Sequence, residues 1–351
     1  MKQLSELRQD LVTGEWVVVA TARARRPNDF AKRTRSARRQ PKAGCPFEEL
    51  SSRVLLAYDA KGERFPVPPP GARLTPKDRT YLNRAWQVQV IPNKYPAFAQ
   101  HGVCAVERTI GPHHWQDGVG FHEIVITRDH TKSVAEMSEK EVVIILQAYR
   151  SRYVALKDDS CVEYISIFHN HGPSAGASVS HPHSQIIAIP VIPPDVGRSL
   201  RGSAEYFKKN RTCVHCTMLA FERKEKTRIL YENDRFTVLC PYVSRSAFEV
   251  HLFPRYHASE FEETSDQDLN AAADALKRAI RAIGRSLNNP DYNFFIHTAP
   301  TAGGGAVRSY HWHIEIIPKT AIWAGFEIGT GIEISTIAPE SAAKYLRTYI
   351  Q

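Results

Sequence analysis

The sequence predicts an α+β fold in which one structural unit occurs twice in a pseudo-twofold repeat, with mainly antiparallel sheets and packed helices. Two observations predict it. The first is an internal repeat at an offset of 127 or 128 positions, in which Phe121, His130, Ser138, Glu141, Tyr164 and His169 correspond to Phe248, His257, Ser265, Asp268, Tyr292 and His297. The second is the order strand, helix, strand, strand within each copy, which is typical of α+β folds.

Each copy begins with a strand and continues into a helix. The segments 121–127 (FHEIVIT) and 248–254 (FEVHLFP) are rich in the β-branched and aromatic residues that favour strands. Ser138 and Ser265 each precede an acidic residue by three positions, which is the spacing of a helix-capping box. The helices that follow carry apolar residues on one face at the helical period, namely Val142, Ile145, Tyr149, Tyr153 and Leu156, and then Leu269, Ala272, Leu276, Ile280, Ile283 and Leu287.

Two further strands close each copy. They are YISIF (164–168) and QIIAI (185–189) in the first copy, and YNFFI (292–296) and IEII (314–317) in the second. The ends of the copies align HSQIIAIP (183–190) with HWHIEIIP (311–318). The stretch IPPDVGRS (192–199) marks the expected boundary, so the predicted domains are 1–192 and 193–351.

Composition excludes several classes of protein. Of 351 residues, 42% are hydrophobic and 24% charged, which is typical of a soluble globular protein. No apolar run approaches the roughly 20 residues that span a bilayer, and the N-terminus lacks a signal-peptide pattern. We therefore expect a cytoplasmic protein without a membrane partner. Six cysteines are too few for a disulfide scaffold, and Cys104, Cys161 and Cys240 are interpreted as small core residues.

Charge is concentrated near the start of the chain. The formal net charge is +9, and the stretch from Arg23 to Lys42 holds nine basic residues against one acidic residue, Asp29. Such a stretch either attracts phosphate groups or, for most of its basic residues, forms a solvated basic loop. Nucleic acid is disfavoured as the ligand because Phe30 is the only aromatic residue there, whereas stacking on single strands needs several.

The chemistry is predicted at the end of the first copy. A glycine- and serine-rich loop (169–180), whose N–H groups are expected to cradle an anion, leads into His181 and His183. Residues two apart on a strand point to the same face, so His181, His183 and Gln185 lie side by side. A neutral imidazole is a good nucleophile toward phosphorus. The pattern therefore predicts nucleophilic or metal chemistry at His181 and His183, with Gln185 close enough to donate to a phosphoryl oxygen.

The motif HPHSQ (181–185) after such a loop resembles the active-site motif of the galactose-1-phosphate uridylyltransferases. These belong to the histidine-triad superfamily, as do sugar-nucleotide phosphorylases such as ADP-glucose phosphorylase. Three further segments resemble this family in the same order, TGEWVVVATARARRP (13–27), IPNKYPAF (91–98) and GFEIGTG (325–331). The resemblance covers nearly the whole chain and implies two histidine-triad-like domains.

The resemblance implies a ping-pong reaction through a nucleotidyl-histidine on His183. A nucleoside diphosphate sugar is the donor, and a hexose 1-phosphate or inorganic phosphate is the acceptor. The expected enzyme is a UDP-glucose:hexose-1-phosphate uridylyltransferase, with an ADP-glucose-type phosphorylase as the alternative. Family positions around the substrate fall on Arg23, Arg26, Asn93, Asn170, Ser178, Phe326 and Glu327. Of these, Phe326 and Glu327 match a segment that serves the neighbouring subunit, which implies a homodimer.

Metal centres are expected in both copies. Cys213, Cys216, His257 and His311 offer the two sulfurs and two nitrogens that suit tetrahedral zinc, and the family carries such a site. The first copy repeats the plan with Cys45, His130 and His181, but Glu48 stands where relatives with a full site have a second cysteine. We expect one tightly held zinc ion and a second, substoichiometric one.

Two interpretations complete the sequence analysis. His122 and His169 are interpreted as ordinary strand residues. A zinc-stabilised RNA-binding module without catalysis is the alternative from another class of function, and salt-dependent RNA binding without turnover would favour it. The HPHSQ motif in its loop argues against that alternative.

Overall fold

The computed structural model of the chain describes residues 4–20, 40–49, 51, 53–67, 75–301 and 308–350. Within these ranges the centre of the molecule is a ten-stranded sheet in the order β10-β11-β12-β14-β13-β8-β9-β7-β4-β3. The first copy supplies β3 (Leu56–Asp59), β4 (Trp86–Pro92), β7 (Phe121–Thr127), β8 (Tyr164–His171) and β9 (His183–Ile189). The second supplies β10 (Ile229–Glu232), β11 (Phe236–Leu239), β12 (Val250–Pro254), β13 (Tyr292–His297) and β14 (His313–Pro318).

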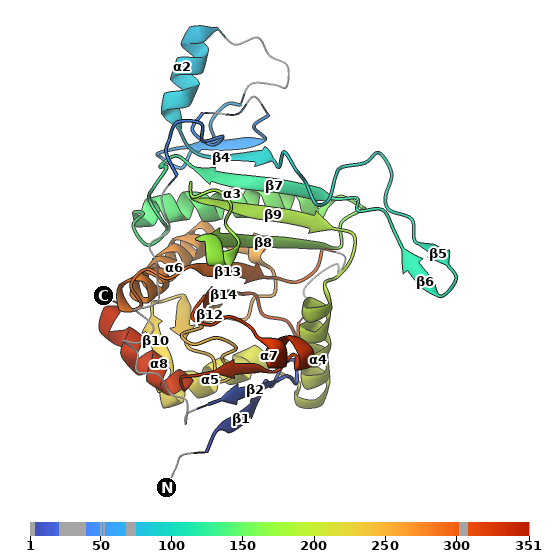
Figure 1. Cartoon of the computed structure of the whole chain (residues 1–351), viewed down its shortest axis with the longest axis vertical. Helices are drawn as coiled ribbons and strands as arrows, with labels where there is room; N and C mark the ends of the chain where they lie inside the picture. The colour runs from blue at the N-terminus through green and yellow to red at the C-terminus, as the bar shows by residue number, and fades with distance from the viewer. Residues whose placement is uncertain are drawn as a thin grey trace.

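The order of the strands shows the predicted repeat. Read outward from the middle, the first copy runs β8-β9-β7-β4-β3 and the second runs β13-β14-β12-β11-β10, with antiparallel neighbours throughout. The correspondence of Tyr164 and His169 with Tyr292 and His297 was wrong, because His169 and His297 lie on opposite faces of the sheet, as do Tyr164 and Tyr292. The copies meet where β8 pairs with β13, with Phe168 opposite Phe295. Figure 1 shows the resulting single sheet running through the molecule. The division at residue 192 remains a prediction, because the two copies share this sheet.

Two long helices cover one face of the sheet. They are α3 (Glu139–Lys157) and α6 (Asp266–Ser286), which pack against each other. Every apolar residue that the helical period assigned to their inner faces is buried. Ser138 caps α3 through a complete capping box with Glu141. The cap of α6 is only half of the predicted box: the Ser265 side chain accepts from the Asp268 N–H, while the Asp268 carboxylate pairs with Arg235.

The remaining elements surround this core. The helices are α2 (Pro76–Ala85), α4 (Pro194–Asn210), α5 (Val214–Glu225), α7 (Gly325–Thr330) and α8 (Pro339–Leu346), with short 3-10 turns at Pro173–Ala175, Phe261–Glu263 and Arg347–Tyr349. The stretch 192–199, expected as a linker, includes the first turns of α4. None of the helices in the described ranges has the length and apolar character that a membrane span requires.

The N-terminal segment lies with the second copy. A three-stranded sheet joins β1 (Glu6–Gln9), β2 (Trp16–Val19) and β15 (Glu333–Ser335), with β15 parallel to β2. The Arg8 guanidinium pairs with Glu340 on α8, 3.0 Å away, and stacks on the Tyr242 ring. The start of the chain is thereby fixed to its end.

A small hairpin projects from the first copy and corrects one prediction. It consists of β5 (Arg108–Ile110) and β6 (His113–Trp115). Cys104, before the hairpin, forms a disulfide with Cys161, after α3, with 4.9 Å between their Cα atoms. The interpretation of these two cysteines as separate core residues was wrong, because Cys104 lies exposed on a loop that folds back onto the end of α3. Cys240 is fully buried, as expected.

Candidate active site and metal centres

His183 stands at the start of β9, on the face of the sheet turned away from α3. The next residue, Ser184, points the other way, and its hydroxyl lies 2.5 Å from the Tyr149 hydroxyl of α3. The Nδ1 atom of His183 lies 2.8 Å from the carbonyl oxygen of His181. A carbonyl only accepts hydrogen bonds, so Nδ1 carries the proton and Nε2 keeps its lone pair.

The surroundings of His183 keep its imidazole neutral. Its side chain is 9% exposed, and its ring packs against Phe47 with 5.1 Å between the ring centroids. Burial lowers the pKa of His183, because a charged imidazolium loses hydration there. A neutral, oriented imidazole with a lone pair on Nε2 is the form that can attack an electrophile.

Gln185 lies two residues further along β9, on the same face as His183. Its Oε1 atom is 2.7 Å from Nε2 of His122, which lies on the neighbouring strand β7. Asn93 follows β4 directly, and its Nδ2 atom is 3.1 Å from the same imidazole nitrogen. The structure therefore brings Gln185 and Asn93 together around His122, a residue that the sequence analysis set aside.

The glycine-rich loop before the motif is held by both copies of the repeat. Gly172 has a φ of +83°, and a Cβ there would lie 1.9 Å from the Asp291 carboxylate, so only glycine fits. Asp291, which precedes β13, accepts from the Ser174 N–H at 2.6 Å. Asn293 donates to Asn170 Oδ1 at 2.7 Å and to the Ala175 carbonyl at 2.8 Å.

The predicted anion cradle differs in the structure. The Ser174 N–H is bonded to Asp291, and the N–H groups of Ala175, Gly176 and Ala177 are bonded to carbonyls of Gly172 and Pro173. These four donors serve a tight 3-10 turn because the chain reverses there. The turn shapes the loop, and those N–H groups do not point to a ligand.

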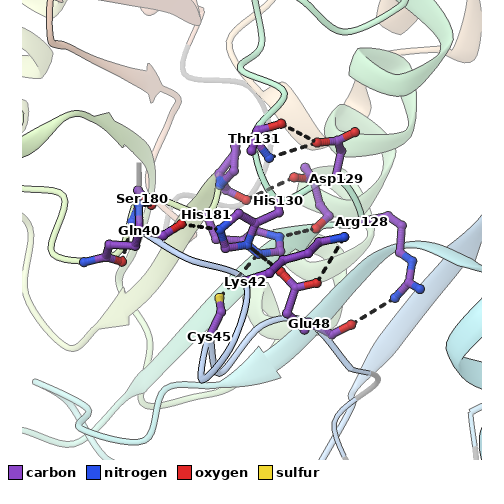
Figure 2. A network of polar contacts seen from close by, with 12 residues as sticks. Gln40, Lys42, Cys45, Glu48, Arg128, Asp129, His130, Thr131, Ser180 and His181 are labelled. Atoms are coloured by element: carbon purple, nitrogen blue, oxygen red, sulfur yellow. Dashed lines mark hydrogen bonds and ion pairs between the residues drawn. The ribbon is translucent and has the colours of Figure 1, made fainter. Parts of the chain in front are cut away.

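The first candidate metal centre combines residues from three separate segments (Figure 2). Cys45 and Glu48 come from the loop before β3, His130 from the turn after β7, and His181 from the H-P-H motif. Their ligand atoms all lie within 4.8 Å of one another. His130 Nδ1 is 3.2 Å from His181 Nδ1 and forms a short contact with the Glu48 carboxylate.

Hydrogen bonds outside the centre fix how these imidazoles are protonated. His130 Nε2 donates to the Gln40 carbonyl at 2.9 Å, and His181 Nε2 donates to the Thr127 carbonyl at 2.7 Å. Both Nδ1 atoms are then left to face each other, the Cys45 sulfur and the Glu48 carboxylate. Facing lone pairs and a carboxylate repel unless a cation lies between them. The donor set therefore fits a metal ion.

The second centre has the same plan with better ligands. Cys213, Cys216, His257 and His311 also have their ligand atoms within 4.8 Å of one another. Cys216 Sγ lies 3.5 Å from Nδ1 of each histidine, and His311 Nε2 donates to the Pro254 carbonyl at 3.1 Å. The hydrogen bonds of Cys216 and the two histidines hold the pKa of the Cys213 thiol far below its usual value. Two sulfurs and two imidazoles suit tetrahedral zinc.

The metal centres show that the sequence alignment of the two motifs was displaced by two residues. His311 occupies the position of His181, since each donates to the strand end of its own copy and belongs to the candidate ligand group of its own copy. His313 therefore corresponds to His183, and its Nδ1 donates to the His311 carbonyl at 3.0 Å. Glu315 takes the place of Gln185. The registers of the sheet place the copies 127 positions apart on β8 and β13 but 130 apart on β9 and β14. The loop before H-W-H is therefore three residues longer than the loop before H-P-H, which an alignment anchored on Pro190 and Pro318 could not show.

The surroundings of His313 are acidic. Glu315 Oε1 lies 3.3 Å from His313 Nε2, and Arg245 forms ion pairs with both Glu315 and Glu249. A cavity of about 630 Å³ opens beside this cluster, and it is lined among others by Phe221, Tyr242, Arg245, Glu249, His313 and Glu315. The buried carboxylates oppose an incoming phosphate, so phosphoryl chemistry is better placed at His183 than at this cavity.

The other predicted residues divide into three groups. Asn170 lies on β8 beside the glycine loop, and the carbonyl of the exposed Ser178 accepts from Gln40 at 3.2 Å. Phe326 and Glu327 lie on α7, where Glu327 caps its own helix by accepting the Ala324 N–H. Arg23 and Arg26 fall outside the described residues.

Two features went unnoticed in the sequence. His122 contacts both Gln185 and Asn93. The sequence feature that could have indicated this is its position on the strand next to the motif, on the same face of the sheet as His183 and Gln185. Asp291 and Asn293, from the second copy, shape the active-site loop, and nothing in their local sequence indicates this. His169 behaves as the strand residue that was expected. Its side chain is buried, and its Nδ1 atom forms a hydrogen bond with the Ser184 hydroxyl at 3.0 Å. Its ring stacks on Phe294 with 5.0 Å between the ring centroids.

The chain is similar to known proteins over nearly its full length. The family model described as galactose-1-phosphate uridyl transferase, N-terminal domain, matches residues 1–193, and a model of a domain of unknown function (DUF4921) matches residues 114–350. The ADP-glucose phosphorylase of Arabidopsis thaliana is 32% identical over 98% of this chain and 93% of its own length. The galactose-1-phosphate uridylyltransferase of Thermotoga maritima is 27% identical over 98% of each.

Solved structures of several proteins resemble the structure of this chain over nearly its full length. A GalT-like protein of Arabidopsis thaliana gives a TM-score of 0.78 at 32% identity, covering 99% of both chains. An ADP-glucose phosphorylase from the same plant, solved with bound ADP-glucose, gives 0.76 at 30% identity over 98% of both. A uridylyltransferase gives 0.73 at 25% identity over 99% of this chain and 98% of its own.

Proposed function

This chain belongs to the galactose-1-phosphate uridylyltransferase family, and we propose that it transfers a nucleoside monophosphate from a nucleoside diphosphate sugar through a covalent intermediate on His183. The observation that carries the proposal is the 2.8 Å hydrogen bond from His183 Nδ1 to the His181 carbonyl. It holds the ring in one tautomer and leaves the lone pair on Nε2, on the face of the sheet turned away from α3. A nucleophile fixed in this way loses little entropy on reaching the transition state.

The reaction has two matching halves. In the first, His183 Nε2 attacks the α-phosphorus, an N–P bond forms, and the P–O bond to the sugar 1-phosphate breaks. The imidazole becomes positively charged, and its Nδ1–H stays on the His181 carbonyl, which stabilises that charge. In the second half, a phosphate oxygen of the acceptor attacks the same phosphorus and the N–P bond breaks. The leaving phosphate needs no proton, so no separate acid is required.

The metal centres serve the geometry of this site. A zinc ion held by Cys213, Cys216, His257 and His311 would link α5 to β14, and an ion held by Cys45, Glu48, His130 and His181 would fix the start of β9. When bound, such ions supply structural rigidity, which is the role of closed four-ligand sites. The first centre shares His181 with the hydrogen bond that orients His183, so its occupancy and the alignment of the nucleophile are linked.

Within this chemistry we favour an ADP-glucose phosphorylase activity, with inorganic phosphate as the acceptor and ADP and glucose 1-phosphate as products. The relative with that name is 32% identical over nearly the full chain, against 27% for a full-length uridylyltransferase. The order of the TM-scores, 0.76 against 0.73, is the same. This choice reverses the expectation from the motifs, which favoured the uridylyltransferase.

Uridylyl transfer between hexose 1-phosphates is the second candidate. The active-site motif H-P-H-S-Q is the feature that favours it, because it resembles the active-site motif of the galactose-1-phosphate uridylyltransferases. Both candidates use the same His183 intermediate and differ in the base and in the acceptor.

A matrix of two donors and two acceptors tests the proposal. ADP-glucose and UDP-glucose are each combined with inorganic phosphate or galactose 1-phosphate, and products are separated by ion-exchange chromatography. We expect the fastest turnover with ADP-glucose and phosphate. Fastest turnover with UDP-glucose and galactose 1-phosphate would select the second candidate. If no pair turns over while RNA binds in a salt-dependent manner, nucleotidyl transfer is wrong and the non-catalytic alternative holds.

We also propose that the chain forms a homodimer through the segment that carries Phe326 and Glu327. The apolar side chains around α7 are unusually exposed, with Ile322 at 94%, Trp323 at 59%, Phe326 at 48% and Ile328 at 72%. An apolar patch of this kind is typical of a protein–protein interface. A cytoplasmic location stays a prediction beside this proposal.

A further inference from the structure

We propose that His122 is a positioning residue for the transfer reaction: it fixes the orientation of the Gln185 amide so that its NH2 group faces the transferred phosphoryl group. This rests on the function proposed above. His122 lies on β7, next to β9, and its imidazole contacts a backbone N–H on one side and the Gln185 amide on the other. The inference follows from the order in which these contacts fix one another.

The first step is the backbone donor. The Ala97 N–H lies 3.1 Å from Nδ1 of His122. A backbone N–H can only donate, and its direction is fixed by the chain, so Nδ1 must accept and carries no proton. The single proton of the ring therefore lies on Nε2. Reassigning a side-chain amide does not change this step, because its donor is a backbone N–H.

The second step is the Gln185 amide. His122 Nε2 lies 2.7 Å from Gln185, and because Nε2 carries the proton it must face an acceptor. The oxygen Oε1 is the only acceptor that this amide has. Gln185 is thereby held with Oε1 toward His122, and its NH2 group is left on the side of the site. An amide with the opposite orientation would present an oxygen to the phosphoryl oxygens and repel them.

Asn93 does not compete for this arrangement. Its Oδ1 accepts the Tyr95 N–H at 3.0 Å, so the group near His122 is its NH2. A donor cannot pair with the Nε2–H group, so this 3.1 Å contact is not a hydrogen bond. It leaves the Asn93 NH2 group beside the Gln185 amide, and both belong to the segments that match the substrate-binding positions of the family.

The contact also connects the nucleotide-binding loop to the reacting phosphate. Ala97 and Asn93 lie in the loop that follows β4, and Gln185 lies on β9. His122 stands between them and contacts both. A shift of the loop on nucleotide binding would therefore reach the Gln185 amide through one imidazole.

The second copy lacks this pairing of a histidine with a glutamine amide. The residue 127 positions after His122 is Glu249, which pairs with His251 at 2.8 Å and with Arg245 at 3.3 Å. The counterpart of Gln185 is Glu315, which has no NH2 group to orient. A donor at the His122 position is thus found only in the copy that carries the candidate nucleophile, within the described residues.

The test is a double-mutant cycle on the full chain. Transfer is followed as the rate at which the α-phosphate label of ADP-glucose or UDP-glucose becomes attached to protein. We expect His122→Phe to slow labelling by about 10- to 100-fold through a misplaced donor, with little change in the Kd for the nucleotide sugar. Gln185→Ala should slow it about as much, and the double variant no further.

Two variants serve as controls. His114→Phe makes the same change on the exposed hairpin strand β6 and should leave labelling unchanged. His122→Gln keeps an N–H donor near the Nε2 position, so its rate of labelling should fall less than that of His122→Phe. Independent, multiplicative losses in the His122→Phe and Gln185→Ala cycle would overturn the proposal, as would equal labelling by wild type and His122→Phe.

A second readout does not depend on turnover. In ¹⁵N-histidine NMR spectra of the full-length protein, His122 should show the Nε2–H tautomer, assigned by its loss in His122→Gln. An Nδ1–H tautomer overturns the proposal even if His122→Phe fails to fold. If wild-type protein never becomes labelled, the proposed function is wrong. If it does and His122→Phe labels equally fast, only the role of His122 is wrong.

Discussion

The two copies of the repeat use one backbone plan around different charges. In each, the second histidine of an H-x-H motif donates Nδ1–H to the carbonyl two residues earlier, at 2.8 Å for His183 and 3.0 Å for His313. The side chain two residues further along is Gln185 in the first copy and Glu315 in the second. An amide donates to a phosphoryl oxygen, whereas a buried carboxylate repels it. The same imidazole is therefore suited to phosphoryl transfer in only one copy.

The candidate metal centres also differ between the copies, but here the second copy has the better set of ligands. The second copy has two cysteines and two histidines, and the first replaces one cysteine with Glu48. A carboxylate is a poorer zinc ligand than a thiolate in a tetrahedral site. The copy with the better candidate metal centre is thus the one without the proposed nucleophile, which favours a supporting role for that copy.

That support reaches the active site directly. Asp291 and Asn293, at the start of β13, hold the glycine loop of the first copy through the Ser174 N–H, the Ala175 carbonyl and Asn170. The second copy thereby supplies side chains that shape a site whose chemistry belongs to the first. The fold of the second copy is therefore needed even without catalytic groups of its own, because it positions the loop of the other copy.

The largest expected effect that would test this comparison comes from substituting each of the two corresponding histidines, His183 and His313, by itself. His183→Asn should reduce labelling of the protein by the α-phosphate of a nucleotide sugar by at least about a thousandfold, because the nucleophile is gone. His313→Asn keeps a donor for the His311 carbonyl and should leave labelling within about twofold. Acid-labile label is measured on denatured protein. Equal labelling of His183→Asn and wild type, or label lost only in His313→Asn, would show that the active copy has been misidentified.

A second effect concerns the metal centres. Wild-type protein dialysed against a chelator should retain about one zinc ion per chain at the Cys213 centre. Cys213→Ser should lose that ion, and Cys45→Ser should retain it. Glu48→Cys completes the first centre and should raise the retained zinc toward two. Zinc is measured by plasma mass spectrometry, and retention by Cys213→Ser with loss from Cys45→Ser would reverse the assignment.

The smallest effect lies at a position where the copies differ in charge. Glu262, in the second copy, corresponds to Ala135 in the first, and burial raises the pKa of Glu262 to about 7. Because the folded state holds this proton more tightly than the unfolded state does, Glu262 destabilises the fold above about pH 7, and the penalty disappears as pH falls toward its unfolded pKa.

Glu262→Gln should therefore raise the free energy of unfolding at pH 8 by on the order of 1 kcal/mol and leave it nearly unchanged at pH 5. Urea denaturation at the two pH values measures this. Glu263→Gln, at an exposed neighbour, is the control and should change the free energy less. An equal gain at both pH values would mean that the charge of Glu262 is not the cause.

The sequence predicted the parts of the fold that depend on local periodicity. The inner faces of α3 and α6, the cap at Ser138 and the strands of both copies are confirmed, because 3.6-residue and two-residue patterns are properties of the chain itself. The ligand sets of both metal centres were also predicted, since each combines residue types with one chemistry, and the structure brings each set together.

The predictions that failed concern features that depend on contacts between distant segments of the chain. The role of His122 requires the Ala97 N–H, and that contact exists only after β4 and β7 pair. The disulfide joins residues 57 positions apart, on a loop without periodicity. The alignment of the H-x-H motifs failed because loop lengths differ between the copies. The carbonyl partners of the loop N–H groups likewise could not be anticipated from glycine content.

The pairing of β8 with β13 has a consequence for solubility. Edge strands present open backbone groups that template aggregation, and long ones are the most hazardous. Each copy alone would expose β8 or β13 as an edge of eight or six residues. Joined edge to edge, the copies bury both and leave as outer strands of this sheet only β3 and β10, of four residues each. The duplicated chain is therefore protected against sheet-to-sheet association in a way that neither copy could achieve by itself.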